Sequence, residues 1–241
     1  MNMKVGHQRG MFGVVGGAGP LVAARLQWDF LQHFQRQTQA WRDEEFPAVV
    51  SVNCALEGVD ERGVVHPQAA SMALRRSFEA LESMGAQCVV VACASLHPHI
   101  PSLHCALDWL GFAARHLALS GVERVGVVGS CSSRQDGVFS DALLAAGLIP
   151  VELDASFQTL ADALIRQGMT GQMEGGSRSR IDVLSNHLRA AGAQVVWWGC
   201  TELSFIPAQW LAPGDIQSVP MIVEAMLREV SIPRLSEGEG S

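Results

Sequence analysis

Two cysteines occupy matching places in two similar stretches of the chain. Both stretches begin Gly-Ala-Gln, at Gly85 and at Gly192, and each has a cysteine eight residues after that glycine, Cys93 and Cys200. An apolar run of strand length leads into each cysteine, and a segment of helical pattern precedes each run. The repetition predicts two related halves, each presenting one cysteine at the end of a buried strand.

Two such thiols predict proton chemistry on a carbon atom held between them. A cysteine between a strand end and a helix N-terminus is expected to have a lowered pKa, because the helix dipole favours the thiolate. One cysteine can then remove a proton as thiolate, while the other delivers a proton to the opposite face as thiol. This two-base epimerisation needs no cofactor. Because the Cα–H of an amino acid is weakly acidic, the site also needs donors for the α-carboxylate and exclusion of water.

Packing is the alternative role for a cysteine, since cysteine is among the most buried residue types. The repeat favours chemistry for Cys93 and Cys200, with a disulfide between them as a further alternative. Packing is the role expected for the remaining cysteines, Cys54, Cys88, Cys105 and Cys131. The sequence has no Cys-x-x-Cys pair, which favours free thiols in a reducing cytoplasm.

Alternating strand and helix patterns run through the chain and must position these cysteines. An apolar run at residues 11–15 breaks into a glycine turn at 16–19, and a helical pattern begins at Pro20. Residues 124–129 repeat that strand in the second half, with the hydroxyl-rich turn 130–133 in place of the glycines. The alternation predicts an α/β fold whose parallel sheets are covered by helices and bind ligands at the carboxyl ends of their strands.

The domain organisation follows from the repeat. We expect two pseudo-symmetric Rossmann-like halves with the active site in the cleft between them. The first half should comprise residues 11–106 with 217–231 packed back on it, and the second half residues 107–216. Residues 1–10 and 232–241 are expected to be flexible ends.

Composition excludes several classes of partner. The 241 residues are 48% hydrophobic, which suffices for a core. A net charge of −7, 6% aromatic residues and no tyrosine argue against a nucleic-acid partner. The sequence has no apolar run of membrane-spanning length and no secretory signal at its start, so we expect a cytoplasmic protein without a membrane partner.

Neither an organic cofactor nor a metal is expected. The glycine turn does not match the dinucleotide pattern G-x-G-x-x-G, which argues against nicotinamide and flavin. Cys93, His97 and His99 resemble a zinc set, but only one half carries it, so we expect no metal.

The chain resembles the aspartate/glutamate racemase family, which works without pyridoxal phosphate. Residues 16–21 are similar to the family's opening G-G-M-G-P, and residues 199–203 match G-C-T-E-L, the aspartate racemase form. Residues 43–47 look like D-x-E-x-P, and residues 93–97 look like C-N-T-A-H. The resemblance runs from about residue 11 to residue 230 and so covers the whole fold.

The resemblance implies a fold and a substrate. It implies a parallel four-stranded sheet flanked by helices in each half, with Cys93 and Cys200 as the two bases, and we expect a homodimer. It also implies an acidic amino-acid substrate held by basic side chains. Arg62 lies where the family has an Asp-Arg pair, and Arg166 lies where aspartate racemases have a lysine. Arginine suits a planar carboxylate by bidentate contact, and a solvated surface arginine is the alternative.

Further candidate substrate contacts come from the same turns and motifs. They are Gly17, Asn53, Ala94, Ser95, Ser133, Thr201 and Glu202. Ala94 stands where the family has asparagine, which removes one polar contact to the substrate, and Ser133 is nearest to the family's second turn threonine. Glu202 is either a helix N-terminal acid or an orienter of the second thiol.

Three functions follow from these residues. The leading one is a cofactor-independent racemase for aspartate, glutamate or a close relative. A lyase, isomerase or decarboxylase with one working cysteine keeps the fold but changes the reaction. A non-catalytic protein that binds a small molecule in the same cleft is the third.

Overall fold

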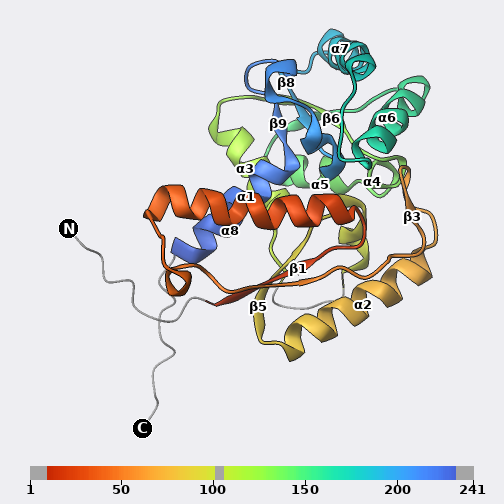
Figure 1. The fold of residues 1–241 in the computed structure, drawn as a ribbon. Helices are drawn as coiled ribbons and strands as arrows, with labels where there is room; N and C mark the ends of the chain where they lie inside the picture. The colour runs from red at the N-terminus through yellow and green to blue at the C-terminus, as the bar shows by residue number, and fades with distance from the viewer. Residues whose placement is uncertain (1–9, 101–105, 232–241) are drawn as a thin grey trace.

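The computed structural model describes residues 10–100 and 106–231, which form two parallel sheets flanked by helices (Figure 1). The first sheet has the order β2-β1-β5, with β1 at Met11–Val15, β2 at Val49–Val52 and β5 at Ala86–Val91. The second has the order β7-β6-β8-β9, with β6 at Arg124–Val128, β7 at Ile149–Val151, β8 at Val195–Trp198 and β9 at Ile216–Gln217. Every neighbouring pair in both sheets is parallel. The expectation of two parallel α/β layers is confirmed.

The first sheet departs from the expected four strands. In the part of the chain that the structure describes it has three strands, and on the side of β5 away from β1 there is only an isolated parallel bridge between Val89 and Ala106. Helix α3 (Trp109–Leu119) begins almost at once, because the Asp108 side chain accepts a hydrogen bond from the Gly111 amide and caps the helix.

Helices cover the faces of both sheets. α1 (Pro20–Thr38) and α2 (Pro67–Ser83) lie on opposite sides of β1 (Figure 1). α1 buries Val22, Leu26, Phe30 and Phe34, whose spacing of four residues places them on one face. The second half carries α4, α5, α6 and α7, at Cys131–Gln135, Val138–Ala145, Ala155–Gly168 and Gly175–Ala190. The order of strands and helices thus follows the sequence pattern.

Helix α8 (Ser218–Ser231) returns the chain to the first half. It follows directly after β9, the edge strand of the second sheet, and packs against α1 and α3. Ser218 is the first residue of this helix, and its hydroxyl donates to the carbonyl of Gly199, next to Cys200, at 2.6 Å. The proposed domain boundaries remain a prediction. The ends expected to be flexible, 1–10 and 232–241, lie outside the described residues apart from Gly10.

A hairpin crosses from the first half to the second. Residues 59–64 contain two short antiparallel strands, β3 (Val59–Asp60) and β4 (Gly63–Val64). The Ser132 amide of α4 donates to the carbonyl of Arg62 at 2.8 Å, and the Val64 amide donates to the Ser132 hydroxyl at 2.9 Å. The hairpin therefore ties the two halves together beside the turn that follows β6.

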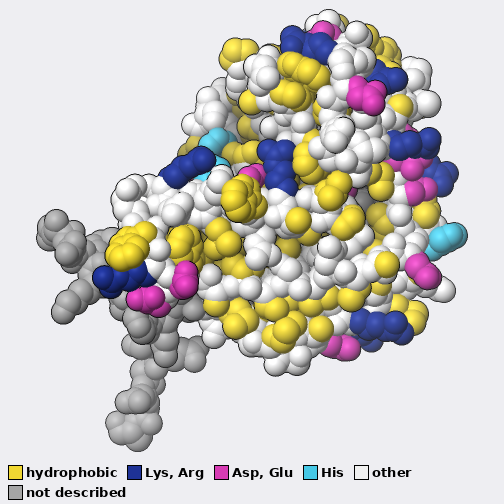
Figure 2. Space-filling model, viewed as in Figure 1, with side chains coloured by type: hydrophobic (Ala, Val, Ile, Leu, Met, Phe, Trp, Pro, Cys, Tyr) yellow, Lys and Arg dark blue, Asp and Glu magenta, His cyan; other side chains and the backbone are white. Residues whose placement is uncertain are grey.

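Basic and acidic side chains are interspersed on the face of the molecule seen in Figure 2, with hydrophobic side chains scattered among them. No helix within the described residues is both long and apolar enough to span a membrane.

A buried aromatic cluster joins the halves at their core. The ring of Trp197 in β8 lies 6.5 Å from Trp109 and 4.9 Å from Phe139, and its Nε1 donates to the Ser218 hydroxyl at 3.1 Å. Trp197 and Trp109 share one buried cluster with Phe12 of β1. The core is thus continuous between the two sheets, so the halves stabilise each other.

We expect Trp197→Ala to lower the free energy of unfolding by about 3–5 kcal/mol, because it leaves a cavity in this shared core and removes the hydrogen bond from Trp197 to the Ser218 hydroxyl. The matched control is Trp28→Ala, since the Trp28 side chain is 63% exposed; it should change stability by less than about 0.5 kcal/mol. Denaturant unfolding measures both values. Equal losses in the two variants would contradict a shared core.

Candidate active site

The two cysteines lie at equivalent places in the two sheets. Cys93 is two residues beyond the end of β5 and Cys200 is two residues beyond the end of β8. Each is followed by a short 3-10 helix, η2 at Ala94–His99 and η3 at Thr201–Phe205. The Thr201 hydroxyl donates to the carbonyl of Ala92 at 3.1 Å. This hydrogen bond brings the two cysteine-bearing turns together.

Cys93 is buried, and its sulfur lies 3.2 Å from the hydroxyl oxygen of Ser95. Burial raises the pKa of the Cys93 thiol to about 12; the charge of Glu202 adds to the rise, and the hydrogen bond with Ser95 opposes it. Cys93 is therefore a neutral thiol at rest, with a hydroxyl beside it.

Cys200 has a carboxylate for its neighbour. Its Sγ donates to Oε2 of Glu202 at 2.9 Å, and the Thr201 hydroxyl lies 3.2 Å from the same oxygen. Burial raises the pKa of the Cys200 thiol well above its usual value, and the charge of Glu202 and its hydrogen bond with the thiol raise it further. Of the two roles foreseen for Glu202, the structure supports contact with the second thiol.

The expected lowering of the thiol pKa values is wrong. The turns after the cysteines are 3-10 segments of six and five residues, not long helices, so little dipole acts on the sulfurs. Removal from water penalises the thiolate in both cases, and the Glu202 carboxylate has the same sign as a thiolate. Both groups therefore rest as thiols.

The glycine turn of the first half reaches the carboxylate of the second. Gly17 has φ +100° and Gly19 has φ +71°, in the region where glycine is favoured. A Cβ at Gly17 would clash with the backbone carbonyl of Cys54, and one at Gly19 would clash with Oε1 of Glu202. Glu202 is thus enclosed by Gly19 at the start of α1 on one side and by Cys200 on the other.

The two arginines lie at the surface, and both are paired. The side chain of Arg62 is 59% exposed and bonds Asp60 at 2.7 Å. Arg166 of α6 is 72% exposed and forms an ion pair with Glu61 across the halves. The hydrogen bonds from these guanidinium groups lower the pKa of Asp60 and of Glu61. The two arginines expected to hold an acidic substrate are therefore already paired with carboxylates of the hairpin.

The other predicted contacts lie in three places. Ala94, Ser95 and Thr201 are buried in the cysteine turns. Asn53 is exposed, and its side-chain oxygen lies over Gly16 of the glycine turn. Ser133 is fully buried, and its hydroxyl donates to the carbonyl of Ser130 at 2.9 Å. Ala94, Ser95 and Thr201 therefore lie with the cysteines, whereas the Ser133 hydroxyl bonds within its own half.

Two residues near the site were not predicted as contacts between elements. Ser132, and not Ser133, bonds the hairpin. The hydroxyl-rich turn at residues 130–133 indicated a polar contact here, but the sequence did not show which serine makes it. His97 is half-buried and lies edge-on to Trp109 at 5.2 Å between ring centroids, and its buried Nε2 has no hydrogen-bond partner among the described residues. Burial lowers the pKa of His97 to about 4, so the ring is neutral. Within residues 10–100 and 106–231, no three His, Cys, Asp or Glu side chains gather to hold a metal.

Comparison with known proteins gives a consistent family. A family model for Asp/Glu/Hydantoin racemase matches residues 28–226. No curated protein matches the sequence.

Solved structures with a similar fold include racemases and a decarboxylase. Aspartate racemase from Picrophilus torridus has a TM-score of 0.70 at 16% identity, covering 92% of this chain and 94% of that one. A glutamate racemase isoform from Bacillus anthracis has a TM-score of 0.67 at 15% identity, covering 93% and 83%. A variant of arylmalonate decarboxylase has a TM-score of 0.51 at 16% identity, covering 95% and 96%. At these identities the likeness shows the fold.

The half-buried His97 should make the protein acid-sensitive. Its pKa of about 4 lies below the usual 6.5, so the unfolded chain binds a proton more readily than the folded one. Stability from this residue is complete above pH 6.5 and falls as the pH drops towards 4, by about 2 kcal/mol between pH 7 and pH 5. In His97→Leu this loss should disappear, whereas in the exposed control His33→Leu it should persist. Unfolding at several pH values measures the slopes; parallel curves for His97→Leu and the wild type would contradict the assignment.

The Glu202 carboxylate should control the reactivity of Cys200. Since the thiolate is the nucleophile, Glu202→Gln should lower the pKa of Cys200 and speed its alkylation by iodoacetamide at pH 8, by about tenfold. The labelling rate of the exposed Cys54 is the internal control. Peptide mapping by mass spectrometry follows each cysteine separately. A rate at Cys200 that is unchanged or slower in Glu202→Gln would show that the carboxylate does not hold this thiol protonated.

Proposed function

The chain belongs to the Asp/Glu/hydantoin racemase family and is an isomerase, and we propose that it inverts an amino acid through Cys93 and Cys200, without a cofactor. The family match confirms the resemblance seen in the motifs. The observation that supports the two-cysteine mechanism is the hydrogen bond from Thr201 to the carbonyl of Ala92, which joins the two cysteine turns.

The proposed reaction begins with Glu202. This carboxylate accepts the Cys200 proton along their 2.9 Å hydrogen bond, which leaves a thiolate and a neutral acid. A thiolate of raised pKa is a stronger base, and this suits it to the weakly acidic Cα–H of an amino acid. The raised pKa values that keep both groups protonated at rest thus also strengthen the base once it has formed.

Cys93 completes the inversion from the opposite face. Cys200 takes the Cα proton, and the electron pair left on Cα is shared with the substrate carboxylate. Cys93 then donates its own proton to Cα, and Ser95 at 3.2 Å can donate a hydrogen bond to the thiolate that remains. Return of the Glu202 proton to Cys93 through water restores the resting state. In the reverse direction the two cysteines exchange roles.

The proposed substrate is aspartate, glutamate or a close relative. The aspartate-type motif Gly-Cys-Thr-Glu-Leu at residues 199–203 supports it, as does the arginine pair at the hairpin. An acidic side chain would replace Glu61 at Arg166, exchanging one carboxylate for another with little change in charge. Without substrate, the hairpin carboxylates would then take the place of the substrate's side-chain carboxylate at the arginines.

A second candidate keeps the fold but uses one cysteine. The likeness to arylmalonate decarboxylase supports it. The repeated turn favours racemisation, because a one-base reaction needs only one of the two cysteines. A homodimer and a cytoplasmic location remain predictions.

Replacement of either cysteine by serine should abolish racemisation in both directions. The hydroxyl of serine does not ionise near neutral pH, and we expect a loss of at least about 10³-fold, or about 4 kcal/mol of transition-state stabilisation. Each variant should still exchange the Cα proton of one enantiomer with deuterium from solvent, and the two variants should prefer opposite enantiomers. Both enantiomers of aspartate and glutamate are assayed by NMR and chiral chromatography.

Cys88→Ser is the matched control, because Cys88 lies in β5 five residues before Cys93. It should retain full activity. Near-normal racemisation in Cys93→Ser or Cys200→Ser would refute the two-base reaction. Exchange without inversion in the wild-type protein would support one-cysteine chemistry instead.

A further inference from the structure

Three consecutive residues, Gln217, Ser218 and Val219, bond the stretch of chain that carries Cys200. We call this stretch, residues 199–206, the Cys200 segment. Gln217 ends β9, and the next two residues begin α8. Since β9 pairs in parallel with β8, whose last residue lies two positions before Cys200, the three residues leave the sheet beside the segment.

The side chain of Gln217 bonds the far end of the Cys200 segment. Its amide nitrogen donates to the carbonyls of Leu203 and Ile206, at 2.8 Å and 3.0 Å. Leu203 lies in η3 and Ile206 directly follows it. The last carbonyls of a helix lack donors within the helix, and here both N–H groups of one amide supply them. The position of η3 therefore depends on this side chain.

Ser218 and Val219 bond other parts of the same segment. The Ser218 hydroxyl donates to the carbonyl of Gly199 at 2.6 Å, and the Val219 amide donates to the Ser204 hydroxyl at 3.1 Å. Ser204 and Ser218 are both buried. Together with the two bonds of Gln217, these contacts bond the segment at its beginning, its middle and its end.

Glu202, inside this segment, is closely enclosed by two helices. A Cβ at Gly168 of α6 would clash with the Glu202 carbonyl, and a Cβ at Gly19 would clash with Oε1 of the carboxylate. Oε2 of the same carboxylate accepts the hydrogen bond from the Cys200 thiol at 2.9 Å. Because the carboxylate has so little free space, its position relative to the thiol depends on where the backbone of the segment lies.

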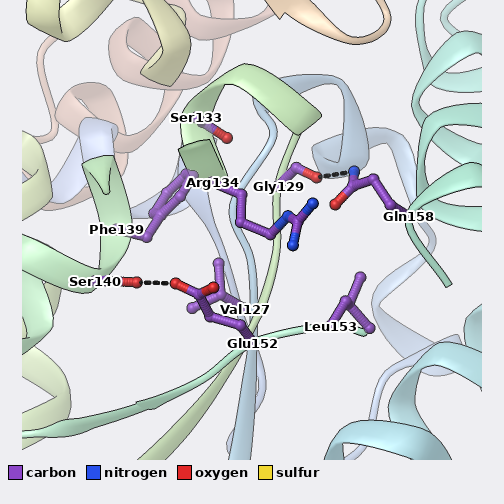
Figure 3. A pocket seen from close by; sticks show the side chains of 9 residues that line it. All are labelled: Val127, Gly129, Ser133, Arg134, Phe139, Ser140, Glu152, Leu153 and Gln158. Carbon is purple, nitrogen blue, oxygen red and sulfur yellow. Dashed lines mark hydrogen bonds between the residues drawn. The ribbon is translucent and has the colours of Figure 1, made fainter. Parts of the chain in front are cut away.

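A second glutamine bonds the turn that follows β6. The amide nitrogen of Gln158 in α6 donates to the carbonyl of Gly129 at 3.1 Å (Figure 3) and to Asp162 at 2.8 Å. The guanidinium group of Arg134 points into the small pocket beside it (Figure 3). Both acceptors of this glutamine lie outside the Cys200 segment, so Gln158 provides a matched control.

We propose that Gln217 is a positioning residue that sets the Glu202 carboxylate against the Cys200 thiol. It acts through the backbone, because its two hydrogen bonds fix the carbonyls of Leu203 and Ile206 and with them the direction of Glu202. This role rests on the proposed function, in which Glu202 accepts the Cys200 proton. Loss of the two amide donors should separate the carboxylate from the thiol without removing either group.

The charged and titratable groups around Cys200 come from both halves. Burial raises the pKa of this thiol most, the Glu202 carboxylate raises it further, and Cys93 of the first half adds to the rise. From α1, the guanidinium group of Arg25 donates to a carbonyl of the Cys200 segment at 2.6 Å. Gln217 is uncharged, so its replacement by methionine changes none of these charges and acts only through their positions.

The test is the rate at which iodoacetamide alkylates Cys200 in the full chain at pH 8, followed by mass spectrometry. Gln217→Met removes both donors but keeps an unbranched side chain. It should speed labelling of Cys200 by about three- to fivefold, because the thiolate is the nucleophile and the carboxylate no longer opposes its formation. The exposed Cys54 is the internal control, and Gln158→Met should leave the rate at Cys200 unchanged.

A double variant separates positioning of Glu202 from general loosening of the turn. In a protein that already carries Glu202→Gln, Gln217→Met should add nothing, because the carboxylate through which it acts is absent. Loosening alone would multiply the two rate increases. With aspartate or glutamate as substrate, Gln217→Met should lower kcat by about tenfold and leave KM within about twofold.

Three results would overturn the proposal. They are an unchanged labelling rate at Cys200 in folded Gln217→Met, an equal increase in Gln158→Met, and effects of Gln217→Met and Glu202→Gln that multiply. Thermal unfolding verifies that each variant is folded. If Gln217→Met does not fold, Gln217→Asn, which is one methylene shorter, takes its place with a smaller increase expected. Labelling as expected in a protein that racemises neither substrate would refute the proposed function and not the position of Gln217.

Discussion

The hydrogen bond from the Thr201 hydroxyl to the carbonyl of Ala92 is the contact on which the proposed chemistry depends. It joins the residue after one cysteine to the residue before the other. Opposed proton transfer requires both sulfurs to meet the same carbon, and only a fixed relation between the two turns provides that. The aromatic core and the hairpin also join the two halves. Without these contacts, a single hydrogen bond would not fix the position of one sheet relative to the other.

Burial of the two thiols is the second constraint, and it has two opposite consequences. Removal from water raises the pKa of both, so that neither is a thiolate at rest. The same removal strengthens each base and lowers the dielectric around a developing charge. At Cys200 the Glu202 carboxylate raises the thiol pKa further, and the proposed reaction uses this same carboxylate, at hydrogen-bond distance, as the proton acceptor. At Cys93 the neighbour is the hydroxyl of Ser95, which stabilises a thiolate but does not remove a proton readily. The two cysteines of this pseudo-symmetric fold therefore have different neighbours, a hydroxyl at Cys93 and a carboxylate at Cys200.

Arg62 and Arg166 are the two cations proposed to hold an acidic substrate. Arg62 and Arg166 meet at the hairpin, where Asp60 and Glu61 already neutralise them. A ligand at this edge must compete with those carboxylates, which favours one that carries a carboxylate of its own. Arg134, in contrast, has its Nε unpaired inside a pocket.

The sequence by itself determined the alternation of strands and helices, the two cysteine turns and the family. These depend on local pattern: apolar runs, glycine turns and the Gly-Cys-Thr-Glu-Leu motif at residues 199–203. Only the tertiary structure decided the protonation of the thiols, because the pKa depends on water excluded by residues far along the chain. It also decided that Ser132 and not Ser133 crosses to the hairpin, since the rotation of α4 selects one serine. The pairing of the arginines and the exposure of Arg134 to a pocket likewise arise from long-range packing, which no local pattern encodes.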